Sequence, residues 1–351
     1  MQDITPDNID RLVSIIGDAG HITIVSHMKP DGDALGSCLG MYHFLGLCGK
    51  TERKIVLPHR PPYYLNFLIG KEVSRNLIIH EDKPSAAEEA IRSSDLIICL
   101  DFNAFHRTDG LEAVLSASEA EKVLIDHHLN PDREKFTLCF SETEISSASE
   151  LTYQILMQTP QTEGDASRLP AGSALALMTG MTTDTNNFAN SVYPSTLRMA
   201  SELIEAGVDR DLILSNLYNQ HSETRMRLMG HVLKDLMTIT GDGVAYIVLD
   251  RKTLQEYPIE EGDTEGFVNL PLSIAKVKMS LLLKEDGNKV RVSIRSKKGI
   301  SANRCSRLHF NGGGHENAAG GRLHIPEDIA GMEEAAAYVE AHTHKFMTDE
   351  N

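Results

Sequence analysis

The sequence contains no long run of apolar residues. A helix that crosses a membrane needs roughly 18 or more consecutive, mostly apolar residues, and no segment approaches that length. The first residues, Met1–Ile16, are acidic and amphipathic, so they lack the basic-then-apolar order of a signal peptide. We therefore expect a cytoplasmic protein with no membrane partner.

Cysteine is scarce and scattered along the chain. The five cysteines form no CxxC pair, and four of them lie in apolar segments, where cysteine packs as a small hydrophobic residue. The pattern therefore indicates neither a disulfide framework nor a zinc finger. These residues are Cys38, Cys48, Cys99, Cys139 and Cys305.

Positive charge is also in short supply. Lys and Arg total 34 against 50 Asp and Glu, which gives a formal net charge of −16. Proteins that bind long duplexes usually carry a basic surface, so we do not expect a long nucleic acid as partner. Between Lys276 and Arg307 the balance reverses, and Glu285 and Asp286 are the only acids. Such a run is consistent with a solvated surface or with a local anion site.

The order of predicted elements indicates two α/β domains. A chain of 351 residues with 41% apolar residues can bury two cores. In the first half, short apolar runs alternate with helical patterns, which favours βαβ units and a parallel sheet. The expected strands are 21–27, 54–57, 95–100 and 122–125, and the expected helices are 33–47, 111–120, 149–158 and 171–181.

The pattern changes in the second half. The period is helical from 193 to 236, and strands are then predicted at 244–249, 278–283 and 289–294, the last two joined by a hairpin at Glu285–Asn288. A glycine-rich loop and a closing helix at 332–344 follow. We therefore expect a first domain over 1–192, a helical linker over 193–235 and a smaller α/β domain over 236–351.

Acidic and histidine residues recur where the predicted strands of the first domain end. In open α/β sheets, ligands bind outside the carboxyl ends of the strands. Each residue alone has an ordinary explanation, such as a helix N-cap, a turn or a satisfied histidine, but their concurrence at one sheet edge favours a site. The residues are His27, Asp31, Asp33, Asp101, Asp126, His127 and His128, with Asp184 near the end of the 171–181 helix.

The chemistry of these residue types points to metal ions. Carboxylates with a few imidazoles suit Mn²⁺ or Mg²⁺, and thiolate ligands are absent from the set. A carboxylate that bridges two ions ~3.5–4 Å apart allows both to act on one phosphoryl group. Asp31 and Asp33, two residues apart on a turn, can each address a different ion. The pattern therefore indicates a two-metal phosphoesterase.

These residues resemble the four motifs of the DHH phosphoesterases. The stretch Gly312-Gly-Gly-His315-Glu-Asn-Ala-Ala-Gly320 is similar to the glycine-rich motif of the DHH-associated domain. The most similar branch contains the bacterial oligoribonucleases that also act as phosphatases on 3′-phosphoadenosine-5′-phosphate (pAp), often called nanoRNases. The resemblance implies a parallel-sheet DHH domain, a smaller substrate-binding α/β domain, an active site in the cleft and a homodimer.

The resemblance also implies roles for the acidic and histidine residues. Two Mn²⁺ ions are expected, with Mg²⁺ or Co²⁺ as alternatives, and Asp101 would bridge them. Asp126 would orient a histidine, and His128 would contact the scissile phosphate. One ion would be held by His27, Asp31 and Asp101, and the other by Asp33, Asp101, His127 and Asp184.

The second domain is expected to bind a substrate phosphate. Glycines at 312–314 allow backbone N–H groups to approach an anion because no Cβ intervenes, although a structural turn would also use them. By resemblance, His315 would donate to the phosphate, Arg295 would clamp it bidentately and Ser296 would assist. The individual glycines are Gly312, Gly313 and Gly314.

The expected activity is hydrolysis of short RNAs, linear dinucleotides or pAp to mononucleotides. Three alternatives stay open. A family II inorganic pyrophosphatase shares the metal motifs, and Arg295–Lys298 is superficially similar to its Ser-Arg-Lys-Lys stretch, in a different order. RecJ-like exonucleases are larger and carry a further oligonucleotide-binding domain. A non-catalytic nucleotide sensor would be expected to have lost metal ligands, and all of them are present.

Overall fold

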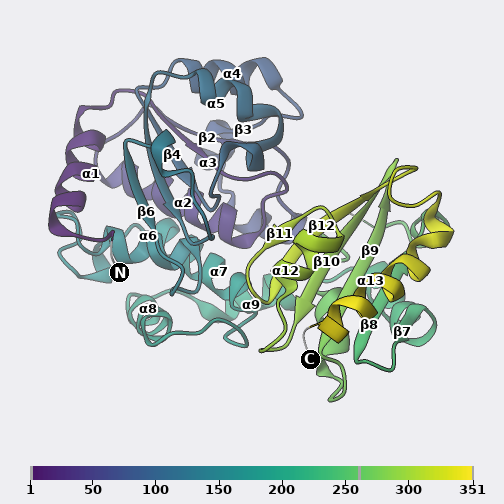
Figure 1. Ribbon diagram of the computed structural model, residues 1–351. Coiled ribbons are helices and arrows are strands. Elements are labelled where there is room, and N and C mark those ends of the chain that lie inside the picture. The colour runs from purple at the N-terminus through teal and green to yellow at the C-terminus, as the bar shows by residue number, and fades with distance from the viewer. Residues whose placement is uncertain (1–2, 260–261, 350–351) are drawn as a thin grey trace. The chain divides into compact units, whose positions relative to one another are not determined.

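The computed structural model describes residues 3–259 and 262–349, which fold into two compact units (Figure 1). The first unit ends at Gln220 and the second begins at His221. This boundary falls within the segment 193–235 that the sequence analysis assigned to a linker. Helices α8 (Pro194–Glu205) and α9 (Arg210–Tyr218) bury Met199, Leu203 and Ile213 in the core of the first unit. A linker role for the whole segment stays a prediction.

The first unit contains a parallel six-stranded sheet with the order β3-β2-β1-β4-β5-β6. Its central strands read as apolar runs because they are buried on both faces, as in β1 and β4. The parallel α/β fold predicted from the sequence is therefore confirmed. The strands are β1 (Ile22–Val25), β2 (Arg53–Leu57), β3 (Leu77–Ile79), β4 (Leu96–Leu100), β5 (Glu121–Asp126) and β6 (Leu138–Ser141).

Helices complete the two layers that flank this sheet. Alternate strand residues face two separate cores, so Ile24 packs in one and Val25 in the other. The helices of the first unit are α1 (Pro6–Asp18), α2 (Gly32–Leu47), α3 (Lys71–Asn76), α4 (Pro84–Arg92), α5 (Glu112–Ala117), α6 (Ala148–Leu156), α7 (Ala171–Asp184), α8 (Pro194–Glu205) and α9 (Arg210–Tyr218).

Helices α2 and α7 approach each other unusually closely. A Cβ added to Gly36 of α2 would lie 2.6 Å from the carbonyl oxygen of Ala176, and one added to Gly40 would lie 2.4 Å from Leu177. Glycine is therefore required at Gly36, where a side chain would meet backbone atoms of α7. At Gly40 the added Cβ would meet only the Leu177 side chain, which would have to move. The close packing joins the start of α2 to the end of α7, the two places from which acidic residues were predicted to reach the site.

The second unit contains a mixed sheet with the order β11-β12-β10-β9-β8-β7. Only β8 and β9 pair in parallel within the described part of this sheet. Gly287, at φ +66°, lies in the predicted hairpin turn between β9 and β10. The strands are β7 (Met237–Ile239), β8 (Val244–Leu249), β9 (Met279–Asp286), β10 (Lys289–Ser296), β11 (Gly313–Gly314) and β12 (Ala318–His324).

The second sheet has a hydrophobic core on each face. One core includes residues of α12 and α13, and the other includes residues of α10 and of the segment around Phe267. No described helix has the length and apolar character that a bilayer span requires. The helices of this unit are α10 (Glu223–His231), α11 (Arg251–Glu256), α12 (Ala302–His309) and α13 (Ala335–Asp349).

Candidate active site

The segment after β1 supplies three of the predicted ligands. His27 is buried, and its Nδ1 lies 2.8 Å from the backbone oxygen of Met28. Asp31 is the N-cap of α2, and one of its carboxylate oxygens accepts from the N–H groups of Asp33 and Ala34 at 3.0 and 3.1 Å. The cap fixes the turn, so the ordinary N-cap explanation holds for Asp31 rather than for Asp33.

Asp33 lies in the first turn of α2 and is almost completely buried. Its two carboxylate oxygens accept hydrogen bonds from the backbone N–H groups of Ala148, at 2.7 Å, and Ser149, at 2.8 Å. These donors belong to the first turn of α6, where the helix dipole favours an anion. This support was not predicted from the sequence, although Ser147 and Glu150 have the spacing of a helix start.

Asp101 directly follows β4 and occupies the centre of the cluster. Its backbone adopts a left-handed φ of +64°, a conformation that few non-glycine residues adopt and that often marks functional sites. One carboxylate oxygen, Oδ2, lies 3.3 Å from Nε2 of His27. The other, Oδ1, lies 3.4 Å from Nε2 of His127. The carboxylate therefore stands between two imidazoles from different strands.

The side chains of the Asp-His-His run at the end of β5 have different partners. Asp126 is fully buried, and its Oδ1 lies 2.7 Å from Nδ1 of His128. His127 turns the other way, with Nε2 3.8 Å from a carboxylate oxygen of Asp33 and 3.8 Å from one of Asp184. The structure therefore brings all eight predicted residues of the first unit into one cluster.

The pKa values reflect strong coupling between these buried groups. Burial would lower the pKa of His27, but Asp101 outweighs it and raises the value to about 9. Burial is likewise overcome at His127, where Asp101 and Asp184 raise the pKa to about 10. Burial would raise the pKa of Asp101, yet the imidazoles of His127 and His27 hold it well below its usual range. The Asp101 carboxylate therefore stays ionised between the two imidazoles.

The pKa values of two other carboxylates, Asp33 and Asp184, shift in the opposite direction. Burial, together with repulsion by Asp101 and Asp184, raises the pKa of Asp33 well above its usual range. Burial also raises the pKa of Asp184, to about 6. Several carboxylates cannot ionise together in a small buried volume unless cations compensate their charge. The cluster therefore favours positive ligands.

The arrangement of donor atoms fits divalent metal ions. Ligand atoms of His27, Asp31 and Asp101 lie within 4.8 Å of one another, as do those of Asp33, Asp101 and His127. Within the described residues, Oδ1 of Asp101 is buried without a hydrogen-bond donor, which is a costly state for a carboxylate oxygen that binds no cation. Oxygen and imidazole donors suit a hard to borderline ion. These residues could hold two ions that share Asp101.

The predicted phosphate-binding residues lie together in the second unit. Arg295 and Ser296 end strand β10, where the Ser296 hydroxyl donates to the Ile300 carbonyl and accepts from the Asn317 amide. The backbone N–H of Gly314 donates to Asn303 Oδ1 at 3.1 Å.

Packing of the loop explains why some positions of this motif are glycine. A Cβ added to Gly312 would lie 1.9 Å from the carbonyl oxygen of Gly320, and Gly314 has a φ of +150°. The backbone N–H of the adjacent His315 donates to Ala318 at 2.8 Å. Glycine is therefore needed at Gly312 and Gly314 for the loop to pack against β12, so the structural-turn explanation applies to these two positions whether or not they also bind phosphate. Gly313 has no such requirement, because its added Cβ would come no closer than 3.4 Å to a neighbouring atom.

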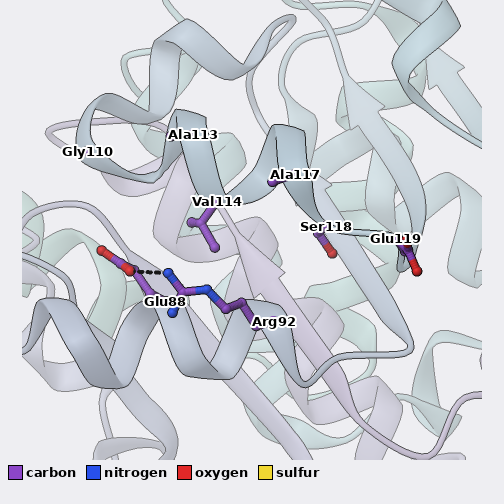
Figure 2. A pocket seen from close by; sticks show the side chains of 8 residues that line it. All are labelled: Glu88, Arg92, Gly110, Ala113, Val114, Ala117, Ser118 and Glu119. Atoms are coloured by element: carbon purple, nitrogen blue, oxygen red, sulfur yellow. Dashed lines mark hydrogen bonds and ion pairs between the residues drawn. The ribbon is translucent and has the colours of Figure 1, made fainter.

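A surface hollow of about 440 Å³ lies between α4 and α5 (Figure 2). Its walls are small residues such as Ala113 and Ala117, with the ion pair of Glu88 and Arg92 at one side. None of the predicted ligands or phosphate-binding residues lines it. Its lining gives no reason to connect it with the acidic cluster.

Comparisons with known proteins match both units of the chain. The model of the DHH family, N-terminal domain, matches residues 21–181, and that of the DHHA1 domain matches residues 241–340. The bifunctional oligoribonuclease and PAP phosphatase NrnA of Thermus thermophilus is 31% identical over 307 residues, which are 87% of this chain and 84% of that protein. The protein of the same description from Mycoplasma genitalium is 26% identical, over 89% of this chain and 92% of that protein.

A solved structure is similar to this chain in fold as well as in sequence. The crystal structure of an exopolyphosphatase-related protein from Bacteroides fragilis shares 36% sequence identity and a TM-score of 0.89, covering 100% of this chain and 99% of that one. The order of the two matched domains, and the sequence identity over most of the chain, agree with the resemblance that the sequence motifs carry. The chain belongs to the DHH family and combines a DHH N-terminal domain with a DHHA1 domain.

Proposed function

We propose that this protein is a metal-dependent phosphoesterase that hydrolyses short oligoribonucleotides, linear dinucleotides and pAp. The observation that carries the proposal is the pair of ligand groups that share Asp101 in the DHH domain. The two NrnA relatives, described as bifunctional oligoribonucleases and PAP phosphatases, support the substrate class. The products would be mononucleotides from an RNA and AMP with phosphate from pAp.

The metal requirement follows from the donor set. We propose that His27, Asp31 and Asp101 hold one Mn²⁺, with Asp33, Asp101, His127 and Asp184 holding the other. Two such cations, when bound, lower the pKa of water and neutralise charge on phosphoryl oxygens. The hydrogen bonds from Ala148 and Ser149 fix the Asp33 carboxylate, so this ligand needs little reorganisation on metal binding.

Asp126 and His128 form the second part of the proposal. Asp126 Oδ1 lies 2.7 Å from Nδ1 of His128, a contact that orients the imidazole ring and directs Nε2 away from Asp126. We propose that Nε2–H donates to a non-bridging oxygen of the scissile phosphate. A donor held in place before reaction stabilises charge that grows in the transition state.

In the second unit, Arg295 and His315 are proposed to bind a terminal phosphate of the substrate, together with the backbone of the glycine motif. The planar guanidinium of Arg295 can address two phosphate oxygens at once. The local excess of Lys and Arg between Lys276 and Arg307 supports an anion there. It also explains how an acidic protein can accept a polyanionic substrate.

A panel of substrates tests the proposal. The manganese-loaded protein is mixed with 5′-labelled RNAs of two to five nucleotides, pAp, linear dinucleotides and inorganic pyrophosphate, and products are followed over time. Mononucleotide or phosphate release from the nucleotide substrates is expected, and pyrophosphate should be a poor substrate. Faster hydrolysis of pyrophosphate than of any nucleotide would instead support a pyrophosphatase. Tight nucleotide binding without any turnover would support a sensor.

Two further proposals concern the protein in the cell. We propose a homodimer, by resemblance to the family, and a location in the cytoplasm. Sedimentation equilibrium of the purified chain, with a mass of 38.7 kDa, tests the first. A single species of twice that mass is expected, and a monomer at micromolar concentration would refute it.

A further inference from the structure

An arginine outside the predicted motifs lies beside the His27 segment. Arg107 belongs to η2 (Phe105–Leu111), the short 3-10 helix that follows β4 and Asp101. The backbone N–H of Met28 donates to the carbonyl oxygen of Arg107 at 2.7 Å. This hydrogen bond joins the backbone of Arg107 to the residue next to His27, although 79 positions separate them in sequence.

The backbone around Arg107 is held in place by its neighbours. The neighbouring Phe105 and Thr108 are buried, and the Thr108 hydroxyl donates to the Phe105 carbonyl at 2.6 Å. The backbone N–H of Arg107 itself donates to Ala104 at 3.0 Å. Side chains on a fixed backbone lose less entropy when they bind a ligand. Arg107 should therefore lose less entropy on binding a ligand than an arginine on a flexible surface loop would.

The Arg107 side chain is half-buried rather than fully solvated. Its backbone is joined by one hydrogen bond to Met28, the residue that follows the proposed metal ligand His27.

Arg107 has no anionic partner of its own among residues 3–259 and 262–349. Asp109, two positions along, pairs with His59 at 3.5 Å instead. Other arginines of this unit do form pairs, including Arg60 with Asp82 at 2.8 Å and Arg133 with Asp3 at 2.6 Å. In a chain with an excess of acids, a half-buried arginine that forms no ion pair among the described residues, and whose backbone is bonded to the His27 segment, has the features expected of an anion-binding group.

We propose that Arg107 binds the non-bridging oxygens of the phosphate that undergoes hydrolysis, next to the group formed by His27, Asp31 and Asp101. The inference rests on the proposed phosphoesterase function and adds a residue to its machinery. The ligand is the phosphoryl group shared by short RNAs, linear dinucleotides and pAp. The guanidinium stabilises the charge that develops on these oxygens as the bond to the leaving group breaks.

Kinetics of Arg107 variants test the proposal. Arg107→Ala should lower kcat/KM on pAp and on a dinucleotide by roughly 10²-fold, as expected when a donor to developing charge is removed. Arg107→Lys keeps the charge but loses the planar fork, so an intermediate value is expected. Arg92→Ala is the matched control, because Arg92 pairs with Glu88 in α4, away from the proposed ligands. An Arg107→Ala enzyme within twofold of wild type would overturn the proposal.

Chemical rescue separates phosphate contact from a structural effect. Guanidinium at tens of millimolar, far below the concentrations that unfold proteins, should restore activity to Arg107→Ala and leave Arg107→Lys unchanged. Manganese content, measured by equilibrium dialysis, should equal that of wild type. Lost manganese without rescue would show that Arg107 only supports the His27 segment, which contradicts the proposal.

Binding of inorganic phosphate makes the inference independent of turnover. Calorimetric titration of the manganese-loaded protein should give at least tenfold weaker phosphate binding in Arg107→Ala than in wild type and Arg92→Ala. This outcome would support Arg107 as an anion ligand even if no nucleotide were hydrolysed. Equal affinity in all three proteins would refute the inference, and it would leave the proposed function to the substrate panel.

Discussion

The carboxylate of Asp33 accepts a 2.8 Å hydrogen bond from the backbone N–H of Ser149, 116 residues further along the chain. This contact places a proposed metal ligand on the N-terminus of α6, so the position of the helix and the geometry of the site are linked. The next residue, Glu150, is fully buried and forms hydrogen bonds at the start of the same helix, α6. Its Oε2 accepts from the N–H of Ser146, at 3.2 Å, and from the hydroxyl of Thr196, at 2.7 Å.

Replacing Glu150 tests this support. Glu150→Ala leaves the N–H of Ser146 and the Thr196 hydroxyl buried without their acceptor, which should cost about 1–3 kcal/mol per unsatisfied group. Glu150→Gln keeps one acceptor oxygen and should be less damaging. Urea unfolding measures the loss in the free energy of unfolding of each variant, provided that this free energy depends on urea concentration with the same slope in all proteins. Equal stability of Glu150→Ala and wild type would show that the network does not support α6.

Glycine substitutions test the close packing of α2 on α7. Gly36→Ala places a Cβ 2.6 Å from the Ala176 carbonyl and 2.9 Å from Gly180, so the two helices must separate. We expect lower stability and weaker manganese binding, because Asp33 and Asp184 lie on these two helices. Thermal unfolding and equilibrium dialysis measure the two effects.

Gly17→Ala provides the matched control for Gly36. Gly17 lies in α1 with nothing within 4 Å of an added Cβ, so the same chemical change should stabilise the protein by about 0.5–1 kcal/mol. An increase in the unfolding temperature of Gly36→Ala similar to that of Gly17→Ala would contradict the packing argument.

Metal removal should destabilise the protein. Bound Mn²⁺ would compensate the charges of Asp33, Asp101 and Asp184, whereas the unfolded chain holds no such site. At a free manganese concentration of 100 times the dissociation constant, linkage predicts about 2.7 kcal/mol of added stability. Thermal unfolding with manganese and with a chelator measures the difference. The same unfolding temperature with manganese and with a chelator would argue against a metal site built from these residues.

Asp126→Asn tests the orientation of His128. The amide keeps the shape of the side chain but removes the carboxylate that holds Nδ1 of His128 at 2.7 Å, so kcat should fall by roughly 10–100-fold, as for other carboxylates that orient active-site histidines. Manganese content should stay near that of wild type, because Asp126 is outside the proposed ligand set. Steady-state kinetics on pAp and metal analysis of the same samples decide the point. An unchanged kcat would remove His128 from the proposed mechanism.

Much of the first unit could be predicted from sequence for a physical reason. Central parallel strands are buried on both faces, so β1, β4 and β5 appear as apolar runs, and the polar residues after each run mark the sheet edge. The edge strands β3 and β6 were missed because they are short and only partly buried, unlike the four-residue strand β1, which is buried throughout. Strand β12 was missed because Ala318–Gly321 has little strand propensity and resembled part of a glycine loop.

The features of the site that were missed depend on tertiary contacts. The hydrogen bonds to Asp33 come from backbone groups, which any residue type supplies, so Ala148 gives no signal in the sequence. Arg107 approaches the His27 segment only because η2 follows the neighbouring strand. The requirement for Gly36 is similarly invisible until α2 and α7 are packed together. Local patterns identify residue types, whereas these contributions arise from the fold.

The central claim is that the cluster around Asp101 binds metal ions and is the site at which short oligoribonucleotides and pAp are hydrolysed. Its most direct test is a product time course on pAp and a labelled dinucleotide RNA, comparing wild type with Asp101→Ala in manganese and measuring the metal content of both. We predict mononucleotide release by the wild type and loss of both activity and bound manganese in the variant. Mononucleotide release at the wild-type rate by Asp101→Ala, or none from a fully metal-loaded wild type, would contradict the account.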